Sequence, residues 1–175
     1  MKWKVFKAYN GLVDGTVPSY VTVDEGGNAV DRWAKLTFST TLPAIAGGAN
    51  LAVGKLIYTL PAGELLITGS SMSAAITQAD GNITADTPDV GIGTTIGSGA
   101  VAVLSGTAAF ENILTGQTAA DCDGTATVAT VATNLVVATA GNHTVYLNVA
   151  DGWAASGDAG AALTGTVYLS WKQFS

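Results

Sequence analysis

The clearest pattern along the chain is an alternation of apolar and polar residues near its C-terminus. Between Leu163 and Lys172 the odd-numbered positions are Leu, Gly, Val, Leu and Trp, and the even-numbered ones are Thr, Thr, Tyr, Ser and Lys. From His143 to Val149 the odd positions are again mostly apolar and the even ones polar. A period of two places alternate side chains on opposite faces of a β-strand. We therefore predict two strands with one buried face each, and expect Leu147, Val149, Val167 and Leu169 to pack between sheets.

Further strands are indicated in the middle of the chain. Residues 55–60 predict a strand with Leu56, Tyr58 and Leu60 on one side, and with Lys55, Ile57 and Thr59 on the other. Pro61-Ala-Gly63 predicts a turn, and residues 64–68 the next strand. Residues 126–133 repeat Ala, Thr and Val with a period of three, so we assign them to β-structure from residue types alone.

Turn signals divide the whole chain into short segments. Glycine-containing pairs such as Asn10-Gly11, Asp80-Gly81 and Asp151-Gly152 recur at short intervals, and no convincing amphipathic helix separates them. Short strands between such turns are typical of an antiparallel sandwich or barrel. The 175 residues are enough for one domain with a substantial core. We predict an all-β fold in a single domain.

The first forty residues differ in composition from the rest of the chain. Four of the seven basic residues lie before position 33, and the segment also holds the two tryptophans Trp3 and Trp33 and a turn-rich stretch at Asp24–Asn28. We interpret residues 1–40 as an N-terminal arm or edge segment, and residues 41–175 as the β-sandwich body. No second domain is indicated.

Composition excludes several classes of protein. Hydrophobic residues make up 48% of the chain and charged residues 11%, which argues against intrinsic disorder. The net charge of −6 and the scarcity of Lys and Arg argue against nucleic-acid binding. No apolar run is long enough to span a membrane. The basic N-terminus is followed by no apolar stretch typical of a signal peptide, so we expect the chain to be made and kept in a cytoplasm, or assembled into a larger structure there.

The residues that usually perform catalysis are scarce. His143 is the single histidine, and its place at the start of a predicted strand favours a structural role over that of a catalytic base. Cys122 is the single cysteine, so no intramolecular disulfide can form. Asp121 and Asp123 should raise the pKa of its thiol, which opposes a role as nucleophile. We therefore expect no catalytic residues.

Acidic and glycine-rich segments could suggest metal or phosphate sites. Asp80-Gly-Asn82, Asp86 with Asp89, and Asp121 with Asp123 offer oxygen ligands, but none matches a calcium-binding loop. Asp, Asn and Gly also gather in turns for conformational reasons, so we assign these segments to turns. The segment Gly91–Gly97 lacks the lysine and helix of a phosphate-binding loop and is interpreted as a glycine-rich β-loop. No metal and no cofactor is expected.

Four segments in order resemble a known family. They are residues 53–70 (strand, Pro-Ala-Gly turn, strand), 88–94 (Pro-Asp-Val-Gly-Ile-Gly-Thr), 109–114 (Ala-Phe-Glu-Asn-Ile-Leu) and 163–171 (Leu-Thr-Gly-Thr-Val-Tyr-Leu-Ser-Trp). This order resembles the small decoration (cement) proteins on the heads of tailed bacteriophages. The resemblance covers roughly residues 50–172 and supplies no individual functional residue. It implies a jelly-roll-like sandwich, no catalysis, assembly in the host cytoplasm, and homotrimers bound to the major capsid protein.

The expected function is therefore that of a virion structural protein on the capsid surface. A charge-poor surface rich in Thr, Ser and Gly can be buried against neighbours without stripping many ions of water. Alternatives are a phage tail, fibre or other capsid subunit, and a carbohydrate-binding β-sandwich of an adhesin. For sugar binding, Tyr146, Trp153 and Tyr168 are the candidate aromatic residues.

The N-terminus is the candidate capsid-binding element. Lys2, Lys4 and Lys7 lie within the first seven positions and alternate with the aromatic residues Trp3 and Phe6. Aromatic residues are enriched in interface cores, and basic ones would be attracted to an acidic patch on the shell. The other interpretation is an ordinary first strand, with Trp3 and Val5 on one face.

Overall fold

The protein consists of two packed β-sheets. The computed structural model describes residues 14–45, 52–98, 104, 109–119, 121–138, 140–141, 143–150 and 158–174. These residues form nine strands and no helix. The strands are β1 (Val21–Gly27), β2 (Asp31–Thr41), β3 (Val53–Thr59), β4 (Glu64–Thr77), β5 (Asp89–Gly93), β6 (Leu114–Thr118), β7 (Asp123–Val137), β8 (Thr144–Ala150) and β9 (Ala162–Phe174).

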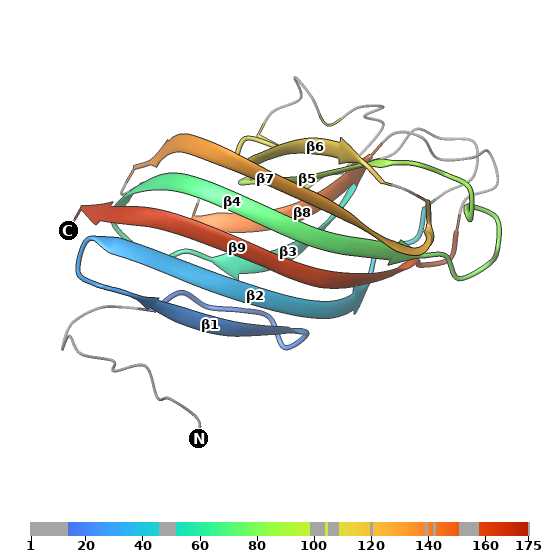
Figure 1. Ribbon diagram of the computed structural model, residues 1–175, viewed down its shortest axis with the longest axis horizontal. Coiled ribbons are helices and arrows are strands. Elements are labelled where there is room, and N and C mark those ends of the chain that lie inside the picture. Colours follow the sequence, from blue (N-terminus) through green and yellow to red (C-terminus); the bar gives the residue numbers. More distant parts are fainter. Residues whose placement is uncertain are drawn as a thin grey trace.

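The strand order is that of a jelly roll with one added strand. One sheet has the order β1-β2-β9-β4-β7 and the other β3-β8-β5-β6, with every pairing antiparallel (Figure 1). From β2 to β9 the chain crosses between the two sheets at nearly every connection, which is how an eight-stranded jelly roll is wound. The predictions of an all-β antiparallel sandwich, a single domain and a jelly-roll-like order are confirmed.

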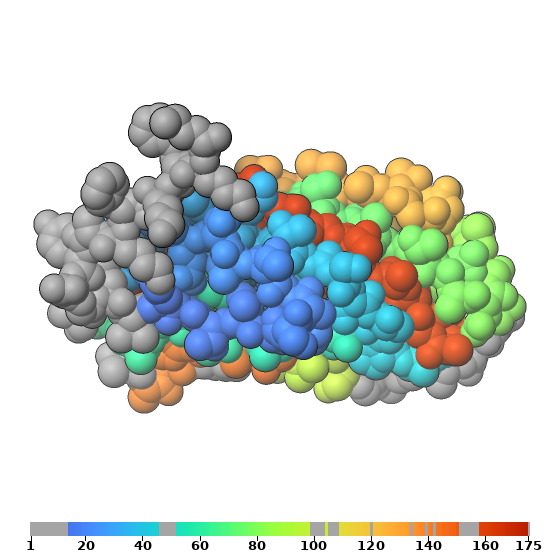
Figure 2. Space-filling model, turned by 90° about the horizontal axis from the view of Figure 1, so that it is seen from below, coloured from blue at the N-terminus to red at the C-terminus, as the bar shows by residue number. Residues whose placement is uncertain are grey.

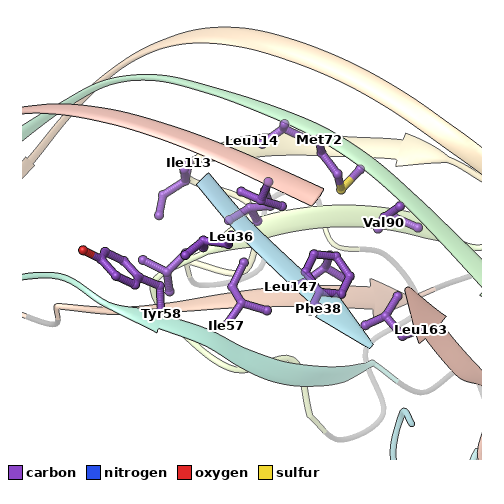
Figure 3. Close-up of a cluster of buried hydrophobic side chains, with 14 of the residues drawn as sticks. Leu36, Phe38, Ile57, Tyr58, Met72, Val90, Ile113, Leu114, Leu147 and Leu163 are labelled. Atoms are coloured by element: carbon purple, nitrogen blue, oxygen red, sulfur yellow. The ribbon is translucent and has the colours of Figure 1, made fainter. Parts of the chain in front are cut away.

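One apolar core fills the space between the sheets. Leu36 and Phe38 from β2 point toward Leu147 from β8, and Met72 from β4 lies near Leu114 at the start of β6 (Figure 3). The four residues that alternation assigned to the core, Leu147, Val149, Val167 and Leu169, are all buried. The predicted faces of the strand at 163–172 are confirmed, because its even-numbered side chains lie on the outer side of the sheet.

The predicted faces of residues 55–60 are wrong at Leu56 and Ile57. Leu56 was expected on the side of Tyr58, but it pairs with Tyr146 of β8 whereas Tyr58 pairs with the core residue Val145. Sequence alternation placed Ile57 with Lys55 and Thr59, away from Tyr58, but Ile57 and Tyr58 are both fully buried. The cause is a β-bulge in β3, where the register with β8 shifts between Leu56 and Tyr58. A bulge adds one residue to a strand and so breaks the period of two. The turn at 61–63 is confirmed, with Gly63 at φ 121°.

The polar face predicted for β8 is also wrong at one position. Asn148 was placed on an outward face but is completely buried. Its Oδ1 accepts a hydrogen bond from the Gly97 amide at 2.7 Å, and its Nδ2 donates to the carbonyls of Thr95 at 2.9 Å and Phe110 at 2.7 Å. Asn148 thus fastens the chain that follows β5 onto the outer side of the four-stranded sheet.

Glycine in β5 lets this covering chain approach closely. A side chain at Gly93 would lie 2.1 Å from the Ala109 carbonyl oxygen and 2.4 Å from the Phe110 carbonyl carbon. Phe110 and Leu104 form a small second apolar cluster with Ala52 and Ala150. The interpretation of residues 91–97 as a glycine-rich β-loop is confirmed, since β5 ends at Gly93 and a loop follows.

Residues 21–41 form the β1 side of the five-stranded sheet. β1 is an edge strand, whereas β2 lies between β1 and β9 and is paired with β9 along its whole length. Figure 2 views the molecule from this side, with β1 in blue and β2 in cyan. The boundary expected after residue 40 therefore falls in the last two residues of β2. Residues 126–133, assigned to β-structure from residue types, lie within the edge strand β7 as predicted.

Candidate functional site

The two sheets differ in what covers their outer sides. The described residues 94–98 and 109–110 cover part of the four-stranded sheet, as the contacts of Asn148 and Gly93 show. The five-stranded sheet faces the viewer in Figure 1. We call its solvent side the outer face, formed by the side chains of Trp33, Lys35, Thr37, Ser71, Ser73, Val128, Thr130, Ala132, Thr166, Tyr168 and Ser170.

Strand register arranges the outer face in rows. One row runs from Thr130 through Ser71 and Tyr168 to Lys35, and the next from Val128 through Ser73 and Thr166 to Thr37. Hydroxyl and methyl groups dominate, and Lys35 is the only charged member of these two rows. The Lys35 ammonium lies 5.5 Å from the centre of the Tyr168 ring, a favourable cation–π distance. Such a surface costs little to dehydrate, because few ions must lose water.

The outer face is hollowed by a groove of about 620 Å³. Trp33 and Tyr168 stand beside it, and both are partly exposed, at 38% and 46%. Its floor is Gly69, which pairs with Ala132 on one side and Ser170 on the other. A small-residue floor beside two large rings produces the hollow.

The two edges of the five-stranded sheet differ in how well they resist pairing with another chain. The edge strand β1 includes the charged residues Asp24 and Glu25, which oppose such pairing. β7 has neither a charged residue nor a proline from Gly124 to Val137, and it exposes Val128 at 72% and Val136 at 61%. Within the described part of the chain, no strand pairs with the second edge of β7. Natural proteins protect open edges with charges, prolines or bulges, so an uncharged apolar edge is a template for contact with another chain.

A partly buried polar cluster lies where β1, β2 and β3 meet. The Tyr58 hydroxyl donates a hydrogen bond to the Glu25 carboxylate, which also accepts one from the Gly15 amide at 3.2 Å. The buried Arg32 guanidinium lies 3.5 Å from the Asp14 carboxylate and 5.9 Å from the centre of the Trp171 ring. Burial raises the pKa of Glu25, and burial with the Glu25 hydrogen bond raises the pKa of Tyr58 well above its ordinary value.

This cluster holds the segment before β1 against β3. Thr16 and Thr59 exchange backbone hydrogen bonds of 2.9 and 2.8 Å. The Tyr20 hydroxyl donates to the Leu56 carbonyl at 2.8 Å. Residues 14–20 are therefore fixed to the body of the sandwich. The candidate capsid-binding residues Lys2, Trp3, Lys4, Phe6 and Lys7 lie outside the described residues.

The histidine and the cysteine are both held in structural positions. The His143 ring nitrogens lie 2.9 Å from the Gly141 carbonyl and 2.8 Å from the Gly63 carbonyl, which links two loops. Cys122 is fully buried next to β7. Burial, with the carboxylates of Asp86, Asp121, Asp158 and Asp123, raises the pKa of its thiol to about 12. The predicted direction is confirmed, but burial contributes more than the flanking carboxylates.

The acidic turns use their oxygens to bind backbone amides. Asp158 accepts hydrogen bonds from Ala79, Asp80 and Gly160, and these hold its pKa below the ordinary value although burial opposes ionisation. Asp123 accepts from Thr125, as in an Asx-turn. Among the described residues, no three His, Cys, Asp or Glu side chains gather closely enough to hold a metal ion.

The aromatic candidates for sugar binding are separated by the fold. Tyr168 borders the groove, whereas Tyr146 lies on β8 in the other sheet, and Trp153 is outside the described residues. The second aromatic residue of the groove is Trp33, which sequence reasoning did not select. Alternation in residues 32–39 could have predicted its position. Arg32, Ala34, Leu36 and Phe38 point inward, so Trp33 must point outward.

No helix in the described part of the chain is long and apolar enough to cross a membrane.

Comparisons with known proteins give one structural likeness. No protein-family model matches the sequence, and no curated protein matches it. The fold is similar to a chain of a solved structure described as "Cyanophage Pam1 capsid asymmetric unit", with a TM-score of 0.45 and 15% sequence identity. The match covers 99% of this chain and 100% of that one.

Proposed function

We propose that this chain is a non-enzymatic structural protein of a phage virion, and specifically a decoration protein that binds the capsid surface. The observation that supports an assembly role best is the β7 edge. It offers fourteen consecutive uncharged residues, Gly124–Val137, with Val128 and Val136 exposed. An edge of this kind promotes aggregation of a free monomer, so it fits a protein in which another chain covers the edge.

The outer face supports the same role. Its row of Val128 and Ser73, which lies outside the groove, can be buried together with the edge, without removing water from carboxylates or ammonium groups. Stable subunit interfaces are more apolar than ordinary protein surface. The charged side chains of Asp24, Asp31, Lys35 and Lys172 lie on β1, β2 and β9, away from the β7 edge.

The assignment to a phage head rests on the order of sequence segments that resembles decoration proteins. The jelly-roll fold fits this role, since viral capsid domains use it, but lectins use it too, and the fold alone does not decide. The same resemblance suggests a homotrimer, bound to the major capsid protein in the host cytoplasm. We include these points in the proposal.

Head binding is tested by co-sedimenting the purified protein with undecorated phage heads, and its oligomeric state by native mass spectrometry. The edge variant is Val128→Lys with Val136→Lys, because lysine is a common protection of open edges. The control is Thr37→Lys, an exposed position on β2 of the same face. We expect the edge variant to fold normally and to lose trimers or head binding, and the control to keep both. Wild-type protein that is monomeric and binds no heads contradicts the proposal.

The N-terminal arm is tested separately. Deleting residues 1–9 leaves untouched every described contact of residues 14–20, including the Thr16–Thr59 pair and the Arg32–Asp14 ion pair. We expect the deleted protein to fold and form trimers but to bind heads more weakly than wild type. The difference should be larger at low salt than at moderate salt, where the charge attraction of the arm is screened. Normal head binding eliminates the arm, and loss of folding favours an ordinary first strand.

A tail or fibre subunit is the competing virion role. It predicts that the protein assembles through the β7 edge but does not co-sediment with heads. The edge variant would then lose its oligomers, while neither wild type nor variant would bind heads.

A further inference from the structure

The groove on the outer face has features of a ligand site that assembly does not require. It crosses the sheet from β2 over β9 and β4 to residues 130–132 of β7, and it leaves the exposed Val128 and Val136 outside its lining. Its volume of about 620 Å³ falls within the range of ~300–1,000 Å³ found for small-molecule sites. Such sites combine mostly apolar walls with a few placed polar groups.

Two neighbouring rows of side chains build the groove. One row runs from Ala132 through Gly69 and Ser170 to Trp33, and the next includes Tyr168. Trp33 and Tyr168 are diagonal neighbours on β2 and β9, since Trp33 pairs with Ser170 and Tyr168 with Lys35. Both residues line the β2–β9 side of the groove, and the Trp33 indole also extends over Gly26 of β1.

Hydroxyl groups supply the polar part of the lining. The Thr68 and Ser170 hydroxyls lie 3.0 Å apart and share a hydrogen bond at the floor. Ser71 and Thr130 add two more hydroxyls, which make no side-chain hydrogen bond within the described part of the chain. A hydroxyl both donates and accepts, so these groups match a ligand that also carries hydroxyls.

We propose that this groove binds a neutral oligosaccharide. A pyranose ring has an apolar C–H face, which fits an aromatic ring, and a rim of hydroxyls, which fits the Ser and Thr side chains. No carboxylate lines the groove, which disfavours a cation. No lysine or arginine lines the groove, and the Lys35 ammonium lies over the Tyr168 ring, which disfavours an anion.

Gly69 allows the groove to be filled without disturbing the fold. A Cβ at this position would lie 3.3 Å from the Ser170 hydroxyl oxygen and 3.5 Å from the Val131 carbonyl oxygen. Gly69→Leu therefore places a side chain in the hollow with only a small shift of the Ser170 hydroxyl. Ser73→Leu is the matched control, because Ser73 is exposed on the same face of β4 and lies outside the groove.

The experiment probes an array of neutral glucose-, galactose- and mannose-based oligosaccharides, followed by calorimetric titration with the best ligand. We expect wild-type protein and Ser73→Leu to bind it equally. Gly69→Leu and Trp33→Ala should each weaken binding by about tenfold or more, with unchanged circular dichroism. The absence of any array signal from folded wild-type protein, or binding unaffected by Gly69→Leu, overturns the proposal.

Head binding and oligomeric state are measured on the same variants. We expect Gly69→Leu to keep both, because the groove proposal is independent of the capsid role. If Gly69→Leu loses trimers or head binding while wild type shows no sugar signal, the groove is a protein contact and the sugar proposal is wrong. If wild type binds a sugar but no heads, the groove proposal stands and the decoration role falls.

Discussion

Replacing Asn148 by alanine is expected to detach residues 94–97 from the outer side of the four-stranded sheet. The Asn148 side chain is completely buried and makes three hydrogen bonds, all to backbone groups of Thr95, Gly97 and Phe110. Alanine can make none of them. The amide of Gly97 and two carbonyls would lose their partner in a place that water reaches only if the loop lifts.

The expected loss of unfolding free energy follows from these three hydrogen bonds. A hydrogen bond contributes about 1 kcal/mol net when water can replace it, so three give about 3 kcal/mol. The loss is larger if the loop stays closed, because each unsatisfied buried group costs ~1–3 kcal/mol. For a chain of this size, ~2–4 °C of melting temperature correspond to 1 kcal/mol, which gives a decrease of about 6–12 °C.

Thermal unfolding measured by circular dichroism tests this value, and hydrogen exchange of the Gly97 amide tests its cause. The exposed Asn82, changed to alanine, is the control and should melt close to wild type, as surface substitutions usually do. An Asn148→Ala protein that melts within about 2 °C of wild type, with a protected Gly97 amide, refutes the reasoning.

Three further predictions concern the core, the polar cluster and the cysteine. Val167→Asp buries an unpaired charge between the sheets and should cost several kcal/mol in chemical denaturation, whereas Thr166→Asp on the outer face should not. Because the pKa of Glu25 is raised above 4.5 in the fold, its contribution to stability is present below that pH and is lost as the pH rises through the raised value. The stability of Glu25→Gln relative to wild type should therefore increase with pH over this window, and a flat difference contradicts it. Cys122, buried and with a pKa of about 12, should react with iodoacetamide at neutral pH only after unfolding; rapid labelling of the folded protein would show an open site.

Local pattern was sufficient for the strands that obey a strict period of two. The segment 163–172 alternates because β9 lies in the middle of its sheet, with the core on one side and the outer face on the other. Every second residue is then buried and must be apolar, so the burial is visible in the sequence as alternation. The same reason made Leu147 and Val149 predictable from residues 143–149. The turn at 61–63 could be predicted because proline restricts the backbone and glycine allows conformations that other residues avoid, and both effects are local.

What local pattern missed depends on contacts between distant segments. Ile57 is buried because of a bulge in the pairing of β3 with β8, and Asn148 because the chain around Thr95 and Phe110 folds over it. The groove arises in the same way. Trp33 and Tyr168 are 135 positions apart in the sequence, and only the pairing of β2 with β9 brings both into the lining of one groove with Gly69. Alternation determines which face a side chain takes, but the neighbours on that face are chosen by strand register, and register is a property of the tertiary structure.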